Sequence, residues 1–135
     1  MNKITVDAVL ENLQTVMDFA TENLEAHDCS MKVSMQLELV IEEIFVNISS
    51  YAYHPEIGSA TFCMEFEKEP AAVLMTFIDG GKPYNPLEKN DPDTTLDIDE
   101  RDVGGLGIFL VKKNVDEISY EYADGKNILH MKRFF

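Results

Sequence analysis

The chain has 135 residues, of which 45% are hydrophobic and 27% are charged, and its formal net charge is −14. This length and composition predict one globular domain over residues 1–135 with a sizeable core. The acidic balance argues against nucleic-acid binding, which needs clustered lysine and arginine, but not against a nucleotide ligand, which needs few donors. No apolar run near Met1 is long enough for a signal peptide or a membrane span, so a cytoplasmic protein without membrane contact is expected.

The first half of the chain predicts a strand followed by two helices. Residues 3–6 suit a short strand, and apolar residues then recur at helical spacing over residues 10–27. Ser30 is a suitable N-cap for the second helix, whose apolar stripe runs as far as Tyr51 before a proline and a glycine close it.

The pattern then changes to that of strands. Residues 60–66 alternate with period two, and residues 72–78 form a nearly continuous apolar run that suits a buried central strand. An acidic, proline-containing segment over about 88–103 follows, and its composition predicts a solvated loop.

The last third predicts a helix and a hairpin. A glycine cluster at 104–107 opens a helix over 108–114, and strands at 117–122 and 128–131 are joined by an Asp-Gly turn. The whole order predicts an α/β (α+β) two-layer sandwich, with helices on one face of a mixed, mostly antiparallel sheet.

The middle of the second helix carries a polar pair among apolar residues. Glu43 and Asn47 are four residues apart and therefore share one helical face. The amide oxygen can ligate a hard cation and the carboxylate can accept a proton, so the pair suits a metal-bound phosphate. Taken alone, the pair also fits the solvated edge of an amphipathic helix.

Two further polar interruptions stand at element boundaries. Asp79 ends the buried strand, and the glycines at 80–81 would let a flat ligand approach, so Asp79 is a candidate reader of the adenine amine. A simple Asp-Gly turn fits the same residues equally well. Gly104-Gly105-Leu106-Gly107 begins a helix, where free backbone amides and the helix dipole favour a phosphate, but this cluster is neither a Walker A loop nor a dinucleotide fingerprint. The acidic segment between the last two boxes suits a lid over a nucleotide.

In this order the three boxes resemble those of the GHKL (Bergerat-fold) ATPases, and within them the anti-sigma factor serine kinases of the RsbW type. Glu43-x-x-x-Asn47 matches the N box of that family, residues 79–86 resemble the first glycine box, and residues 100–111 resemble the lid end and the second glycine box. The chain departs from many relatives at Tyr51, where they carry a histidine.

The resemblance implies ATP and Mg²⁺ as cofactors. It implies that Asn47 ligates the metal, that Glu43 is the general base, and that Asp79 reads adenine. Arg101 is implied as the cation near the transferring phosphate. The nucleotide-binding residues implied in the two glycine boxes are Gly81, Pro83, Gly104, Gly105, Leu106 and Gly107.

The resemblance also implies a protein-serine/threonine kinase that phosphorylates an anti-anti-sigma (STAS) protein, sequesters a sigma factor and forms a homodimer. Two alternatives stay open: a non-catalytic module that binds a partner in a nucleotide-dependent way, and a separate ATP-binding subunit of a histidine kinase. The presence of Glu43 favours the kinase, because a pure binding module needs no base.

Overall fold

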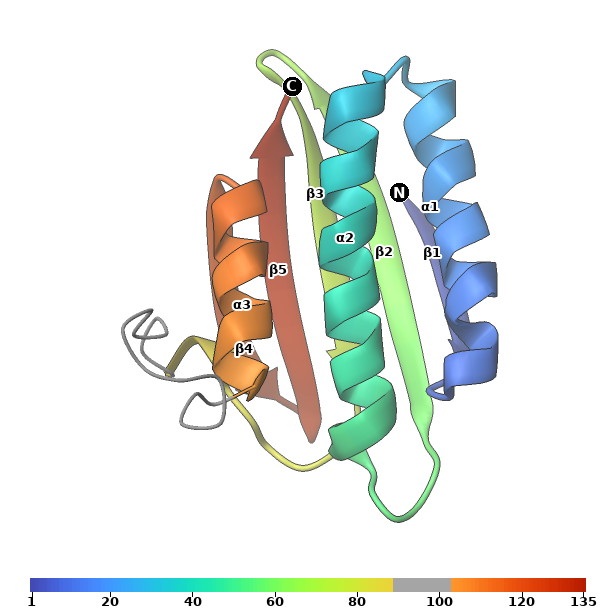
Figure 1. Ribbon diagram of the computed structural model, residues 1–135, viewed down its shortest axis with the longest axis vertical. Coiled ribbons are helices and arrows are strands. Elements are labelled where there is room, and N and C mark those ends of the chain that lie inside the picture. The colour runs from blue at the N-terminus through green and yellow to red at the C-terminus, as the bar shows by residue number, and fades with distance from the viewer. Residues whose placement is uncertain (89–102) are drawn as a thin grey trace.

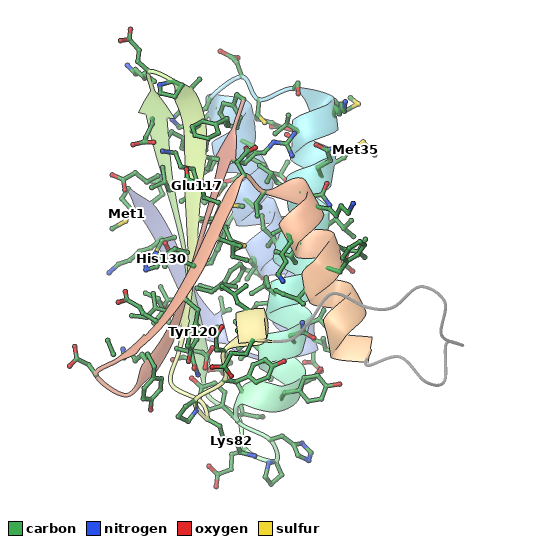
Figure 2. The ribbon with its side chains drawn as sticks, turned by 90° about the vertical axis from the view of Figure 1, so that its left-hand side faces the viewer. Met1, Met35, Lys82, Glu117, Tyr120 and His130 are labelled. Atoms are coloured by element: carbon green, nitrogen blue, oxygen red, sulfur yellow. The ribbon has the colours of Figure 1, made fainter. Side chains whose placement is uncertain are left out.

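One sheet and a layer of helices make up the computed structural model, which describes residues 1–88 and 103–135 (Figure 1). The helices cover one face of the sheet and leave the other face open (Figure 2). The strands are β1 (Asn2–Asp7), β2 (Ser59–Lys68), β3 (Ala71–Asp79), β4 (Glu117–Ala123) and β5 (Lys126–Phe134). The α-helices of the described residues are α1 (Leu13–Ala26), α2 (Met31–Asn47) and α3 (Val103–Asn114).

The sheet has the strand order β1-β2-β3-β5-β4, and each of these four pairings is antiparallel. The apolar run predicted to be a central strand is β3, with Met75 fully buried and Phe77 only 2% exposed. The predicted sandwich with helices on one face of a mostly antiparallel sheet is therefore confirmed, and the described sheet is antiparallel throughout rather than mixed. Because β5 lies beside β3, Asn127 is directly opposite Asp79 at one end of the sheet.

The core lies between the sheet and the helices, and α2 is its central helix (Figure 1). Its buried residues recur at helical spacing, as the sequence predicted: Leu37, Val40, Ile41, Ile44 and Phe45. The predicted extension of this stripe to Tyr51 is wrong, since that side chain is 70% exposed. After Asn47 the chain continues as a π-helical turn over Ile48–Ala52, and the wider turn rotates Tyr51 away from the core.

Two predicted local signals are confirmed and one boundary moves. Ser30 caps α2, because its hydroxyl accepts a hydrogen bond from the Val33 amide at 3.2 Å. The β4–β5 hairpin turns through Asp124 and Gly125, which have φ angles of 53° and 76°, as a two-residue turn requires. The helix predicted to start after the glycine cluster instead starts at Val103, so the cluster at 104–107 lies within its first turns.

The three polar boxes of the sequence meet at one end of the molecule. The end of α2, the end of β3 and the start of α3 lie together there (Figure 1). Among the helices described, none is long and apolar enough to cross a membrane.

Candidate nucleotide-binding site

Two half-buried polar side chains on the last turns of α2 form one side of the candidate site. Glu43 and Asn47 are one helical turn apart and each is partly exposed. Neither side chain forms a hydrogen bond or ion pair with any residue that the structure describes. Polar groups in such a position are incompletely solvated, so a polar ligand is the natural partner for both.

Glu43 lies directly against the start of α3. A Cβ atom placed on Gly107 would be 2.5 Å from Glu43 Oε2 and 3.2 Å from Glu43 Cδ, well inside van der Waals contact. Position 107 therefore needs glycine while Glu43 keeps this position. The contact brings the N box and the second glycine box together, as a site between α2 and α3 requires.

Asp79 forms the second side of the site, at the end of β3, and it is only 8% exposed. Its Oδ1 accepts hydrogen bonds from the Gly81 amide at 2.9 Å and from Asn127 Nδ2 at 3.0 Å. Both bonds from described residues end on Oδ1, which leaves Oδ2 as the oxygen available to a ligand. A carboxylate with one oxygen fixed and the other available suits an amine donor.

The loop after Asp79 is attached to the π-helical turn at the end of α2. The Tyr53 hydroxyl accepts from the Gly80 amide and donates to the Ser59 carbonyl, both at 2.6 Å. The Lys82 amide donates to the Ala52 carbonyl at 3.0 Å. Sequence reasoning assigned no role to the Tyr53 hydroxyl, because only the tertiary arrangement brings it to the loop.

Close packing explains why position 81 is glycine, independently of the predicted role of Gly81 in nucleotide binding. A Cβ atom on Gly81 would overlap the Ala52 carbonyl, so glycine lets the loop lie against the π-helical turn that follows α2. Pro83 follows in the same loop and is exposed. Nucleotide binding by Gly81 and Pro83 stays a prediction.

Asn127 is a site residue that sequence reasoning did not assign. It is 7% exposed and contacts Asp79 as well as the backbone of the loop after it. In the sequence it stands between the Asp-Gly turn and the predicted strand at 128–131, where asparagine is common, so no local signal marked it. Its partner could not be read from the sequence, since Asp79 is 48 residues away.

Part of the predicted phosphate site is not described. Arg101 lies outside the described residues. The backbone of Gly104, Gly105 and Leu106 is helical. For Gly107 the structure also gives the neighbouring side chain, which is Glu43. The predicted roles of these residues stay predictions.

The donor set of the described residues fits a magnesium ion held together with phosphates. Over residues 1–88 and 103–135 there is no cluster of three or more His, Cys, Asp or Glu side chains. Mg²⁺ is usually bound through one or two protein ligands, with phosphate oxygens and waters filling the other positions. The half-buried Asn47 amide, without a protein partner among the described residues, suits that single-ligand role.

A buried aspartate at a strand end, a polar pair on α2 and glycines in the first turns of α3 together fit a nucleotide-binding α/β sandwich. A family model for the histidine kinase-like ATPase domain matches residues 6–133, and the chain belongs to this family. It is accordingly an ATP-binding domain.

A curated relative resembles this chain in sequence, and a solved structure resembles it in fold. The chain is 27% identical over 100 residues to the serine/threonine-protein kinase BtrW of Bordetella bronchiseptica, covering 74% of this chain and 70% of that protein. The crystal structure of the RsbU and RsbW domains of Rv1364c from Mycobacterium tuberculosis has a TM-score of 0.64 at 13% identity. That match covers 99% of this chain and 32% of the other, so this chain spans about a third of it. The predicted resemblance to GHKL ATPases of the RsbW type is confirmed.

Proposed function

We propose that this chain, acting as one domain over residues 1–135, is an ATP-dependent protein-serine/threonine kinase. Its proposed substrate is a serine or threonine hydroxyl of a small STAS-domain protein, and its second partner is a sigma factor that it sequesters. The observation that carries the proposal is the contact between Glu43 and Gly107. It places a carboxylate without a structural partner among the described residues beside a helix start, where phosphates bind favourably. The similarity to a protein named as a serine/threonine-protein kinase supports the same reaction.

The proposed reaction is a single phosphoryl transfer. The substrate hydroxyl oxygen bonds to the γ-phosphorus of ATP while the bond from that phosphorus to the β–γ bridging oxygen breaks, and ADP leaves. Glu43 accepts the hydroxyl proton, so that the attacking oxygen does not carry a positive charge. Such reactions depend mainly on positioning and on stabilising the charge of the transferring group.

The other residues of the site bind and orient ATP. Asp79 Oδ2 accepts a hydrogen bond from the adenine amine, and the amides in the first turn of α3 face the phosphates. Asn47 is the protein ligand for Mg²⁺. When bound, this ion neutralises negative charge on the phosphate oxygens. Arg101 is proposed to add a second positive charge near the transferring phosphate.

The proposal extends to the partners and the setting of the protein. By analogy with the family, phosphorylation of the STAS protein releases it and leaves the kinase free to hold the sigma factor. A homodimer in the cytoplasm is proposed on the same ground. Size-exclusion chromatography with light scattering checks the dimer, and a monomer at micromolar concentration would contradict it.

The test is single-turnover transfer from labelled ATP to the STAS proteins of the same genome, with an ATP titration for each variant. Glu43→Gln keeps the shape of the side chain but cannot accept a proton, so transfer should fall by about 10²-fold or more with ATP affinity nearly unchanged. Asn47→Ala should lower ATP affinity and transfer together. Glu42→Gln is the matched control, because Glu42 is the neighbouring carboxylate on the exposed face of α2.

Two outcomes would contradict the proposal. Parental transfer by Glu43→Gln would show that Glu43 is not the base. A parent chain that binds ATP but transfers phosphate to none of the STAS proteins would favour a nucleotide-dependent binding module instead.

A further inference from the structure

Asn127 is a buried amide that the proposed phosphoryl transfer does not use. It is the second residue of β5 and is paired in the sheet with Asp79, the last residue of β3. The side chains labelled Tyr120 and Lys82 lie toward this end of the molecule (Figure 2). Both residues contact Asn127, one through its hydroxyl and the other through its carbonyl oxygen.

The orientation of the Asn127 amide is fixed by partners of known polarity. Nδ2 donates to the Lys82 carbonyl at 2.8 Å and lies 3.5 Å from the Gly81 carbonyl, and these oxygens can only accept. Oδ1 accepts from the Tyr84 backbone amide at 3.0 Å, a group that can only donate. Exchanging the oxygen and the nitrogen would therefore place like groups against each other at every one of these contacts.

The hydrogen-bonding capacity of Asn127 is fully used within the protein. Its two N–H groups are directed to Asp79 Oδ1 at 3.0 Å and to the loop carbonyls. The two lone pairs of Oδ1 accept from the Tyr84 amide and from the Tyr120 hydroxyl, the latter at 2.5 Å. No donor or acceptor of Asn127 is left for a ligand. Any effect of this residue on nucleotide binding must therefore pass through Asp79 and the loop.

These bonds determine which oxygen Asp79 offers to a ligand. Asn127 holds Oδ1 from the side of β5, and the Gly81 amide holds the same oxygen from the loop. The carboxylate cannot rotate without breaking both bonds, so Oδ2 is presented in one direction. The loop backbone from Gly81 to Tyr84 is held to the same amide, which fixes its distance from the carboxylate.

We propose that Asn127 is a positioning residue that sets the selectivity of the site for adenine, by fixing the Asp79 carboxylate and the loop after it. The inference rests on the proposed role of Asp79 as the reader of the adenine amine. It adds that this reading depends on a buried amide from the other end of the chain, which does not itself touch the nucleotide.

The quantity that tests the inference is the contribution of the 6-amino group of adenine to binding. It is measured as the ratio of the Kd for purine riboside triphosphate, which lacks that amine, to the Kd for ATP. The parent should show a ratio of about ten or more, because the analogue leaves Asp79 Oδ2 without a donor. In Asn127→Ala the carboxylate can rotate toward water, and the ratio should fall to within about threefold of one.

Further variants separate positioning from folding and from direct contact. Ile128→Ala is the matched control, since it removes a half-buried side chain from the next position of β5 and should keep the parental ratio. Tyr120→Phe removes a single hydroxyl donor to Asn127 Oδ1 and should lower the ratio severalfold with the fold intact. Adding Asn127→Ala to Asp79→Ala should leave the ratio of Asp79→Ala unchanged, because the two residues act in series.

The possible results decide the matter in distinct ways. A parent with a ratio near one would overturn both this inference and the adenine-reading role of Asp79. A parent with a high ratio that Asn127→Ala and Tyr120→Phe both retain would overturn this inference alone. If Asn127→Ala does not fold, Tyr120→Phe decides by itself, and an unchanged ratio again overturns the inference. A further fall in affinity specific to ATP, on adding Asn127→Ala to Asp79→Ala, would show direct contact and refute the positioning role.

Discussion

Replacing Gly107 with alanine tests the arrangement of the candidate active site most directly. The added Cβ would stand 2.5 Å from Glu43 Oε2, so the carboxylate must retreat by about 0.9 Å to reach the 3.4 Å at which ordinary van der Waals contact begins. A displacement of about 1 Å in a reacting group can cost about 10²-fold in rate. Phosphoryl transfer by Gly107→Ala should therefore fall by roughly 10- to 100-fold.

The same substitution should not harm folding. Alanine is favoured over glycine inside a helix by about 1 kcal/mol, and Gly107 is the fifth residue of α3. Glu43 is only half-buried, so its side chain can move toward water at small cost. The melting temperature should be unchanged or raised, while activity falls. An unchanged or raised melting temperature together with a loss of phosphoryl transfer distinguishes a displaced base from a damaged fold.

The assay is single-turnover transfer to the STAS substrate, with thermal unfolding and ATP titration on the same samples. The control is the pair Glu43→Asp and Glu43→Asp/Gly107→Ala. The shorter aspartate leaves room for the new methyl group, so alanine should cost little in that background. Parental transfer by Gly107→Ala would refute the reasoning, as would an equal loss in both backgrounds.

Two further predictions concern the adenine side of the site. ATP should bind about tenfold or more tightly than GTP, because Asp79 Oδ2 would face the guanine carbonyl oxygen without a donor, and equal affinities by calorimetry would contradict this. Burial raises the pKa of the Tyr120 phenol above its ordinary value of 10.0; the Tyr84 backbone opposes this shift, and the nearby Asp79 charge adds to it. Because the folded state holds this proton more tightly, its contribution to stability is full below pH 10.0 and is lost as the pH rises through the raised pKa. ATP affinity should decline over the same alkaline range in the parent, and a Tyr120→Phe variant with the same decline would show that the phenol is not responsible.

The sequence predicted the elements well wherever periodicity decides. The continuous apolar run at 72–78 indicated a buried central strand, and Ser30 indicated the start of α2, because both signals are local. The π-helical turn after Asn47 was missed, since one extra residue in a turn leaves no mark on composition. For this reason the sequence pattern wrongly predicted that Tyr51 is buried.

The candidate site was predictable only where a polar group interrupts an apolar pattern. Glu43, Asn47 and Asp79 interrupt apolar patterns, so their polar character was visible in the sequence. The glycine cluster was expected before the third helix, because glycine disfavours helix. In the structure Gly107 lies inside α3, where close contact with Glu43 requires glycine. Asn127 stayed hidden, since its role depends on the register between β3 and β5.

The strand order also has a consequence for how the chain reaches its folded state. β4 precedes β5 along the chain, but β5 stands between β4 and β3 in the sheet (Figure 1). While a ribosome is still adding β5, β4 therefore has no strand of the sheet to pair with, and β3 keeps an open edge. Asp79 lacks its Asn127 partner for the same period. We expect the adenine side of the site to form late in synthesis, so that ATP reaches a completed pocket rather than guiding the early steps of folding.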